Sequence, residues 1–307
     1  MLRLSLCLLL FVTLCPTAAQ AQDKPLHAQH RVVYDNLVAA RLNPLGLEDR
    51  LNLGYRYRLY DDAGLLWRDA YAGVAFTPTL NPAVARVGAS LEVKPLAVLF
   101  MSVGYYFVGW LGSFQFLQSY DSPHAAHSDT AQDEATDANK NYSTMGGELE
   151  IKVQVMGKVG PVVLRNTLNL FHSDMRLENG QRLYYNPRVD AMVPNRGWHL
   201  TNDTDLVWLF RFGLVAGLRA SVVHSFFDPE HYRPGESTEN PNTPIVRMGP
   251  ILAYVFYDGP GSRFNKPTVL LIANWHLSHR WRTGEDVSQG VPYLVLGFKC
   301  SGELLKW

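Results

Sequence analysis

His276 and Ser278 are the residues whose types and spacing best suit catalysis. They lie two positions apart in a segment where apolar and polar residues alternate. Side chains two apart on a β-strand point to the same face, so the imidazole could accept the hydroxyl proton and activate Ser278 as a nucleophile. A third polar group would orient His276, and Glu285 and Asp286 are the first carboxylates that follow. The spacing is compatible with acyl-ester hydrolysis.

This pair resembles the His-x-Ser motif of outer-membrane lipid A deacylases and phospholipases. The resemblance implies that Ser278 is the nucleophile, His276 the base and Glu285 or Asp286 the orienting acid. Asn274 and Arg280 share the same polar face in the alternation, and a polar barrel lumen explains all of these residues without catalysis. We therefore expect a protein that is not an enzyme and keep lipid acyl-ester hydrolysis as the alternative.

His124, His127 and Asp129 form a second group, followed by further acidic residues up to Asp137. Two His three apart with nearby carboxylates could bind a divalent ion, and an outer loop would meet lipopolysaccharide-bound calcium. The Ala, Ser, Asp and Asn composition is also typical of a flexible solvated loop, which is the interpretation we favour. No glycine-rich phosphate loop, paired-cysteine zinc spacing or Gly-x-Ser-x-Gly elbow is present, so we expect no metal and no cofactor.

Charged residues alternate with apolar ones in several other segments. Glu148, Glu150 and Lys152 are separated by Leu149 and Ile151, a pattern that would place charges all around a helix but on one face of a strand. We predict that this face is the interior of a barrel, where the charges form salt bridges or line a charge-selective pore. The predicted lumen-lining residues are Arg56, Arg58, Glu148, Glu150, Lys152, Arg165, Asp203, Asp205, Arg219, Asn274 and Arg280.

These patterns, with the turn signals between them, predict a closed antiparallel transmembrane β-barrel of about twelve strands. Spanning strands need roughly 9–11 residues, and most of the segments reach that length. The predicted strands lie near 31–43, 48–60, 70–77, 83–93, 96–109, 144–158, 161–173, 197–210, 212–225, 245–257, 267–281 and 291–305.

From the fifth predicted strand onward the connections alternate between short and long, whereas the first two outer turns are short. In bacterial outer-membrane barrels both termini are periplasmic, with short turns on that side and long loops outside. With a periplasmic N-terminus, the long segments 110–143, 174–196, 226–244 and 282–290 are all predicted to be extracellular. The links at 94–95, 158–160 and near 211 are short and periplasmic, whereas the link at 258–266 is longer.

The first residues have the parts of a secretory signal: a basic Arg3, an apolar run from Leu4 to Leu14, and the small-residue site around Ala21. We expect Sec export, cleavage near Ala21, and a barrel domain over 22–307. Cys300 is the one cysteine after that site, so no internal disulfide is expected.

The last strand ends in Trp307. A terminal aromatic resembles the C-terminal signature of outer-membrane proteins, and the resemblance implies recognition by the barrel-assembly machinery through this strand. The other expected partners are outer-membrane lipid and lipopolysaccharide. The chain has 28 basic and 28 acidic residues and no basic block, which argues against nucleic acid.

A soluble β-sandwich is the alternative fold, and its exposed faces should be rich in Lys and Glu. Only 18% of the residues are charged, while there are 15 Tyr, 14 Phe and 7 Trp, as a lipid-facing wall with aromatic girdles requires. We predict a non-enzymatic outer-membrane barrel that acts as a narrow pore or as a structural surface protein, its solute unspecified by the sequence. The alternatives are the lipid hydrolase and an exported soluble ligand-binding β protein.

Overall fold

The computed structural model describes residues 26–112, 117–242 and 244–307. The predicted signal peptide therefore lies outside the described residues. Among the residues described, no helix is both long enough and apolar enough to cross a bilayer.

The strands form a closed antiparallel barrel, in which β1 pairs with both β2 and β16. The short segments β3 and β4 both lie between β2 and β5 and act as one interrupted strand, so the wall has twelve strands. The wall consists of β1 (His30–Leu42), β2 (Gly46–Arg58), β3 (Tyr71–Phe76) with β4 (Thr79–Leu80), β5 (Val84–Leu96), β6 (Leu99–Trp110), β8 (Thr144–Val159), β9 (Val162–Met175), β12 (Gly197–Leu209), β13 (Leu214–Ser225), β14 (Ile245–Val255), β15 (Asn265–Ser278) and β16 (Tyr293–Lys306).

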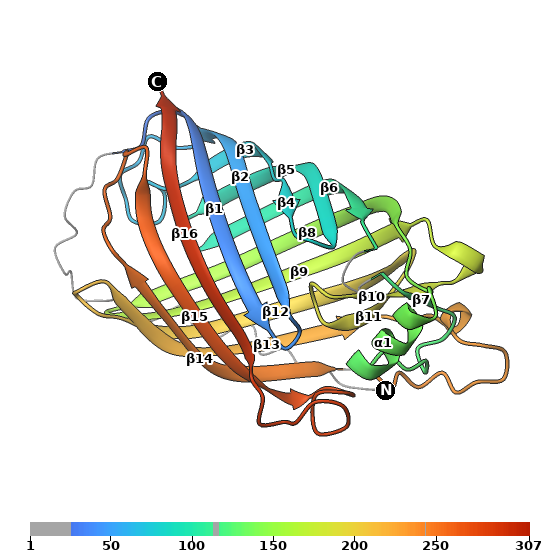
Figure 1. Cartoon of the computed structure of the whole chain (residues 1–307). Coiled ribbons are helices and arrows are strands. Elements are labelled where there is room, and N and C mark those ends of the chain that lie inside the picture. The colour runs from blue at the N-terminus through green and yellow to red at the C-terminus, as the bar shows by residue number, and fades with distance from the viewer. Residues whose placement is uncertain (1–25, 113–116, 243) are drawn as a thin grey trace, which may run out of the picture.

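This architecture confirms the predicted barrel and its twelve strands, and the sandwich alternative is wrong. The two ends of the barrel differ, as Figure 1 shows. We call the end that carries His30, Lys306 and the links 97–98, 160–161 and 210–213 the turn end. We call the opposite end, with the segments 111–143, 176–196, 226–244 and 279–292, the loop end.

Alternation along the strands separates an apolar outer wall from a polar interior. On β6, Val103, Tyr105 and Phe107 are 49–66% exposed, whereas Tyr106 and Val108 between them are buried. Exposed aromatic side chains collect near the turn end, as expected of a girdle at a membrane interface: Tyr55, Tyr57, Trp208, Phe210, Phe212, Tyr254, Phe256, Tyr257 and Trp307. A burial pattern of this kind suits a barrel surrounded by lipid.

The loop end carries its own secondary structure. A three-stranded sheet is formed by β7 (Ser119–Tyr120), β10 (Leu183–Asn186) and β11 (Ala191–Pro194), beside helix α1 (Asp129–Asp137) and the short 3-10 helices η1 (Glu178–Gly180) and η2 (Pro229–His231). Figure 1 shows these elements gathered at the end opposite the C-terminus.

The segment around α1 was predicted to be a flexible solvated loop, and its described part is folded instead. The Ser128 side chain accepts a hydrogen bond from the backbone N–H of Ala131 and so caps the helix. Gln132 is buried and donates to the carbonyl of His127. The composition of this segment predicts a solvated loop. The sequence does not reveal that neighbouring loops cover it in the folded protein.

The hydrophobic core of the protein lies at the loop end. It joins loop residues such as Tyr184 and Val193 to wall residues such as Trp110, Val223 and Ile245, all below 5% exposed. The hairpin formed by β10 and β11, with its turn, is thus packed against the inner wall of the barrel mouth. We call residues 183–194 the plug hairpin.

Candidate functional site

The tip of the plug hairpin is a tight turn encoded by Asn186-Pro187-Arg188-Val189-Asp190. The Asn186 side chain accepts from the N–H of Arg188, and the N–H of Val189 donates to the Asn186 carbonyl. Pro187 fixes its own backbone, and Asp190 adopts a left-handed conformation with φ 57°, which Asp tolerates better than most residues. The turn places the side chains of Arg188 and Asp190 at the tip.

Asp190 is the centre of a buried polar latch at the loop end. Its carboxylate accepts two hydrogen bonds from Arg282, at 2.5 and 2.9 Å, and one from the Tyr185 hydroxyl at 2.7 Å. The imidazole of His279 lies 3.1 Å from the Asp190 carbonyl oxygen and 3.4 Å from its carboxylate. All four side chains are at most 7% exposed. Charge-assisted hydrogen bonds of this kind are stronger than neutral ones.

The electrostatics of the latch favour its ionised form. Burial by itself would raise the pKa of Asp190, but His279 and Arg282 hold that pKa well below its ordinary value. The same carboxylate, against the opposing effect of burial, raises the pKa of Arg282. Nearby, burial lowers the pKa of His127 to about 3. The latch is therefore an ion pair at neutral pH, next to a neutral imidazole.

Arg188, at the same tip, reaches the other side of the lumen. Its guanidinium lies 3.1 Å from Glu148 on β8. Glu148 also lies 2.8 Å from Arg86 on β5, and Arg86 contacts Glu150 at 2.5 Å. Glu150 in turn pairs with Lys152 at 2.9 Å. We call these five residues the paired cluster; in it every charge has an opposite charge in contact.

A second charged group lies on β9, β12 and β13. Asp205 accepts from Arg165 at 2.5 Å and from Arg219 at 2.6 Å. Arg219 also approaches Asp203 to 3.8 Å, and the Ser221 hydroxyl donates to Asp203 at 2.5 Å. Here too acids and bases are matched.

A cavity of about 750 Å³ lies beside the tip of the plug hairpin. Its volume is within the range of small-molecule sites. On one side it is lined by apolar residues of β1, β15 and β16, among them Leu37, Leu270, Ile272 and Val295, and on the other by polar residues, among them Arg188, Asp203, Arg219, Ser221, Arg247 and Asn274. We call it the lumen cavity.

Arg247 differs from the other charged residues of this cavity. It is 9% exposed and its guanidinium carbon lies 4.0 Å from the centre of the Tyr293 ring. Within the described part of the chain, its Nε and Nη1 have no hydrogen-bond partner and it makes no ion pair. Neither side-chain atom of Asn274, which is 1% exposed, has a partner there. Other buried polar atoms of the described residues also lack a partner, among them both ring nitrogens of His276, which pairs with Arg247 in the sheet. Arg247 and Asn274 are distinguished because both also line the lumen cavity.

The structure brings most of the predicted lumen residues into contact with opposite charges. Arg56 on β2 lies 3.7 Å from Glu92 on β5. Arg58, at the turn end, contacts Asp61 and donates to the carbonyl of His27. The paired cluster includes Glu148, Glu150 and Lys152, the Asp205 group includes Arg165, Asp203 and Arg219, and Asn274 lines the lumen cavity.

Arg280 has a different environment from the predicted one. The segment 267–281 was predicted to be a strand, but β15 ends at Ser278. Arg280 donates to the carbonyls of Pro123, His124 and Ala125 and to the Asn242 side chain. It ties three loops together at the loop end rather than lining the spanning wall.

Ser278 and His276 are not brought together, although both lie on β15. Val246 pairs with Ser278 and Arg247 with His276, so the register shifts by one residue between them. This β-bulge breaks the period of two, which leaves His276 buried and Ser278 exposed. Within the described residues neither ring nitrogen of His276 has a hydrogen-bond partner, and its Nε2 lies 3.8 Å from Asp190.

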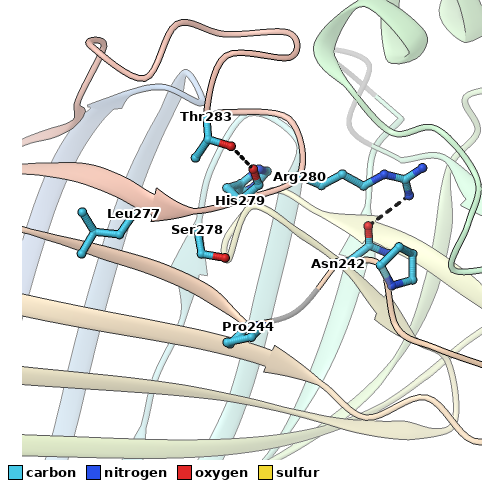
Figure 2. A pocket seen from close by; sticks show the side chains of 8 residues that line it. Asn242, Pro244, Leu277, Ser278, His279, Arg280 and Thr283 are labelled. Carbon is cyan, nitrogen blue, oxygen red and sulfur yellow. Dashed lines mark hydrogen bonds between the residues drawn. The ribbon is translucent and has the colours of Figure 1, made fainter.

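The two acids considered as orienting groups also lie elsewhere. Glu285 is exposed. Asp286 accepts from the N–H of Asp129 and the hydroxyl of Thr130 at the start of α1. Ser278 lines a pocket of about 300 Å³ with Leu277 and Pro244. Figure 2 shows Arg280 directed to Asn242, to which it donates a hydrogen bond. Within the described residues, therefore, Ser278, His276 and the two acids are not in contact with one another.

The three candidate metal ligands have separate contacts. His124 lies 2.9 Å from the Ser237 carbonyl, His127 contacts the Ala125 carbonyl, and Asp129 pairs with Arg282 at 3.0 Å. No group of three or more metal-binding side chains occurs in the part of the chain that the structure describes.

Arg86, Arg188, Asp190, Arg247 and Arg282 were missed by the sequence analysis. Arg86 alternates with Ser90 and Glu92 in a predicted strand, so the same period-two argument could have found it. Asp190 follows an Asn-Pro turn signal within a predicted outer loop, which indicates a turn but gives no sign that the turn enters the barrel.

Comparisons with known proteins give matches of low similarity among solved structures alone. No protein-family model matches the chain, and no curated protein matches it. Among solved structures, the translocator domain of autotransporter NalP from Neisseria meningitidis matches with 11% identity over 90% of this chain and 88% of that one, at a TM-score of 0.36. The outer membrane protein Omp33 from Acinetobacter baumannii matches with 10% identity over 92% of this chain and 100% of that one, at a TM-score of 0.33.

LpxR from Salmonella typhimurium matches with 10% identity, over 88% of this chain and 99% of that one, at a TM-score of 0.37. Independently of these matches, the closed antiparallel wall, the apolar outer surface and the aromatic girdle are the features that define outer-membrane β-barrels. The chain is a protein of this structural class.

Proposed function

We propose that this protein is an outer-membrane channel whose lumen is closed at the loop end by the plug hairpin. The observation that carries the proposal is the reach of the hairpin tip across the lumen. Arg188 contacts β8, whereas Asp190 lies beside β15 and binds Arg282 in the following loop. In the order around the wall, β8 and β15 are separated by four strands, β9, β12, β13 and β14, which places them on nearly opposite sides of a twelve-stranded barrel.

The contacts that hold the tip are suited to opening and closing. Arg188 and Asp190 are held by hydrogen bonds and ion pairs of separate side chains, which water can replace. Tyr184, Val189 and Val193 pack against apolar residues, and these contacts must separate when the hairpin moves. The hairpin is a loop between β9 and β12 and contributes no strand to the wall, so its movement leaves the barrel closed on itself. A structural barrel would not need a cavity of about 750 Å³ beside its plug.

The orientation and the route to the membrane belong to the same proposal. The loop end is extracellular, where it meets lipopolysaccharide, and the turn end with both barrel termini is periplasmic. Sec export with cleavage near Ala21 precedes insertion. The barrel-assembly machinery recognises β16, which closes the wall against β1 and is followed by the aromatic Trp307.

Conductance in planar lipid bilayers tests the channel. The N–H of Asn195 donates to the carbonyl of Arg182 at 2.7 Å, so residues 183–194 can be replaced by a Gly-Ser pair without stretching the chain. We expect rare, small openings from the unchanged protein and a larger, steady conductance from this variant. A milder double variant, Arg188→Gln with Asp190→Asn, keeps the hairpin and frees only its tip.

Folding of each variant is checked by its heat-dependent mobility on gels. A folded hairpin-deletion variant that conducts no better than the unchanged protein would contradict the channel and leave a structural barrel. Ser278→Ala serves as a matched control at the rim, because Ser278 is exposed and should alter neither conductance nor folding.

A further inference from the structure

The unpaired Arg247 points to a ligand. Burying a guanidinium without an acid costs several kcal/mol. Of the other arginines that line the cavity, Arg188 and Arg219 contact carboxylates, and Arg41 donates to the carbonyl of Arg188. Arg247 and Asn274 lie on the neighbouring strands β14 and β15 and both line the lumen cavity. Together they present hydrogen-bond donors with a single positive charge to the same space.

The rest of the cavity is apolar. Leu37 on β1, Leu270 and Ile272 on β15 and Val295 on β16 line the side formed by the closing strands. Val295 pairs with Ile272 in the sheet, so these side chains form a continuous surface. Such a surface favours a hydrocarbon body over a small hydrated ion.

Two acids, Glu48 and Asp203, line the cavity, and neither contacts Arg247 among the described residues. Asp203 accepts from Ser221 and lies 3.8 Å from Arg219, and Arg219 binds Asp205 through two hydrogen bonds. Among the charged residues that line the described cavity, Arg41, Arg247 and Glu48 form no ion pair, so the balance of unpaired charge is positive by one. One guanidinium and one amide match the two oxygens of a carboxylate.

We propose that the lumen cavity binds a small amphipathic carboxylate, with its acid group on Arg247 and Asn274 and its hydrocarbon body against Leu37, Leu270, Ile272 and Val295. The role of this molecule as the transported solute rests on the proposed channel function. The binding itself does not, because the cavity exists whether or not the hairpin opens.

Calorimetric titration of the refolded full barrel in detergent tests the binding. The probe is decanoate, with acetate as a carboxylate that lacks the body and decylammonium as the same body with the opposite charge. We expect saturable binding of decanoate, at least about tenfold tighter than that of either control probe. In Arg247→Gln the affinity for decanoate should fall by at least about tenfold.

Arg56→Gln is the matched control, because Arg56 is a lumen arginine that pairs with Glu92 and does not line the cavity. It should bind decanoate as the unchanged protein does. Leu270→Trp supplies a second test that keeps the charge but fills the apolar side, and it should also weaken binding. Heat-dependent mobility identifies the folded variants that are compared.

Three results would overturn the proposal: no decanoate binding to the folded barrel, equal binding of acetate or decylammonium, or equal loss in Arg247→Gln and Arg56→Gln. Equal binding of acetate would mean a simple anion site. The channel is judged separately by conductance, so decanoate binding without ion flow in the hairpin-deletion variant would refute the channel and keep the binding site.

Discussion

The paired cluster and the lumen cavity are two charged regions of one lumen, and they balance charge in opposite ways. In the paired cluster Glu148 is 1% exposed and contacts both Arg86 and Arg188. In the lumen cavity Arg247 is 9% exposed and has no acid in contact among the described residues. The first arrangement is complete without a ligand and serves to hold the hairpin tip. The second lacks an acid in contact with Arg247 within the part of the chain described, and a bound anion would supply that negative charge.

The largest effect should come from breaking the paired cluster. Glu148→Gln leaves two buried guanidinium groups short of one negative charge, and breaking a buried pair in this way typically costs about 3–5 kcal/mol. We expect the free energy of unfolding to fall by about 3 kcal/mol, measured by urea titration followed through tryptophan fluorescence. Glu285→Gln is the control, since that exposed side chain should change stability by less than about 0.5 kcal/mol. Equal stabilities of the two variants would show that the cluster does not hold the fold.

The latch at Asp190 should have the next largest effect, on opening rather than on unfolding. Asp190→Asn removes the charge that binds Arg282 and leaves that buried cation without one of its acids. We expect the free energy of the open state of the plug hairpin to fall by about 1–3 kcal/mol relative to the closed state, which raises its population roughly fivefold to 150-fold. Conductance and protease cleavage within 183–194 report this population.

Asp174→Asn is the matched control for the latch. Asp174 also pairs with an arginine, Arg196 at 2.9 Å, but both side chains are more than half exposed. Exposed pairs contribute little, so this variant should open no more often than the unchanged protein. If both variants open equally, burial of the Asp190 pair has no special role.

Acid should loosen the loop end through His127. Its pKa is about 3 when buried and 6.5 when free, so the open state binds more protons between these values. The closed state is then fully stable above pH 6.5 and loses about 1.4 kcal/mol per pH unit as the pH falls toward 3. Asp190, whose pKa is lowered, has an effect only near and below its free value of about 3.9, so its titration does not contribute between pH 7 and 5.

His127→Phe removes that pH dependence and keeps an aromatic ring among Tyr120, Tyr185 and Trp281. Open probability is measured between pH 7 and 5, where the unchanged protein should open more often at the lower pH. His279, Arg280 and Asp190 act on His127 electrostatically in both proteins, so the difference between the two slopes isolates the imidazole. Parallel slopes would mean that His127 does not titrate with opening.

The wall of the barrel could be predicted from the sequence because its signals are local. The alternation at Glu148, Glu150 and Lys152 and the turn signals between segments are enough to place twelve strands and their long connections. The lumen charges on these strands follow from the same period. Arg86 on β5 and Glu148 on β8 lie on either side of β6, so their pairing depends on the order of the strands, which the predicted succession of antiparallel strands already implies.

The site itself depends on features without a local signal. The alternation predicts that Ser278 and His276 lie on the same face of the strand. The bulge beside Leu277 shifts the register by one residue and places them on different faces. The plug hairpin enters the barrel because of packing between distant residues such as Tyr184 and Trp110. That Arg247 lacks an acid partner becomes visible only when every carboxylate of the lumen has been placed in three dimensions.

The smallest predicted change in the free energy of unfolding comes from Arg247→Met, and its sign is opposite to that of Glu148→Gln. Arg247→Met removes a buried charge that has no acid partner among the described residues, so the free energy of unfolding should stay constant or rise by up to about 1 kcal/mol. Decanoate at a hundred times its dissociation constant should stabilise the unchanged protein by about 2.7 kcal/mol by mass action and should stabilise the variant much less. A loss of stability like that of Glu148→Gln would mean that Arg247 has a structural partner, and the contrast between the two charged regions would then disappear.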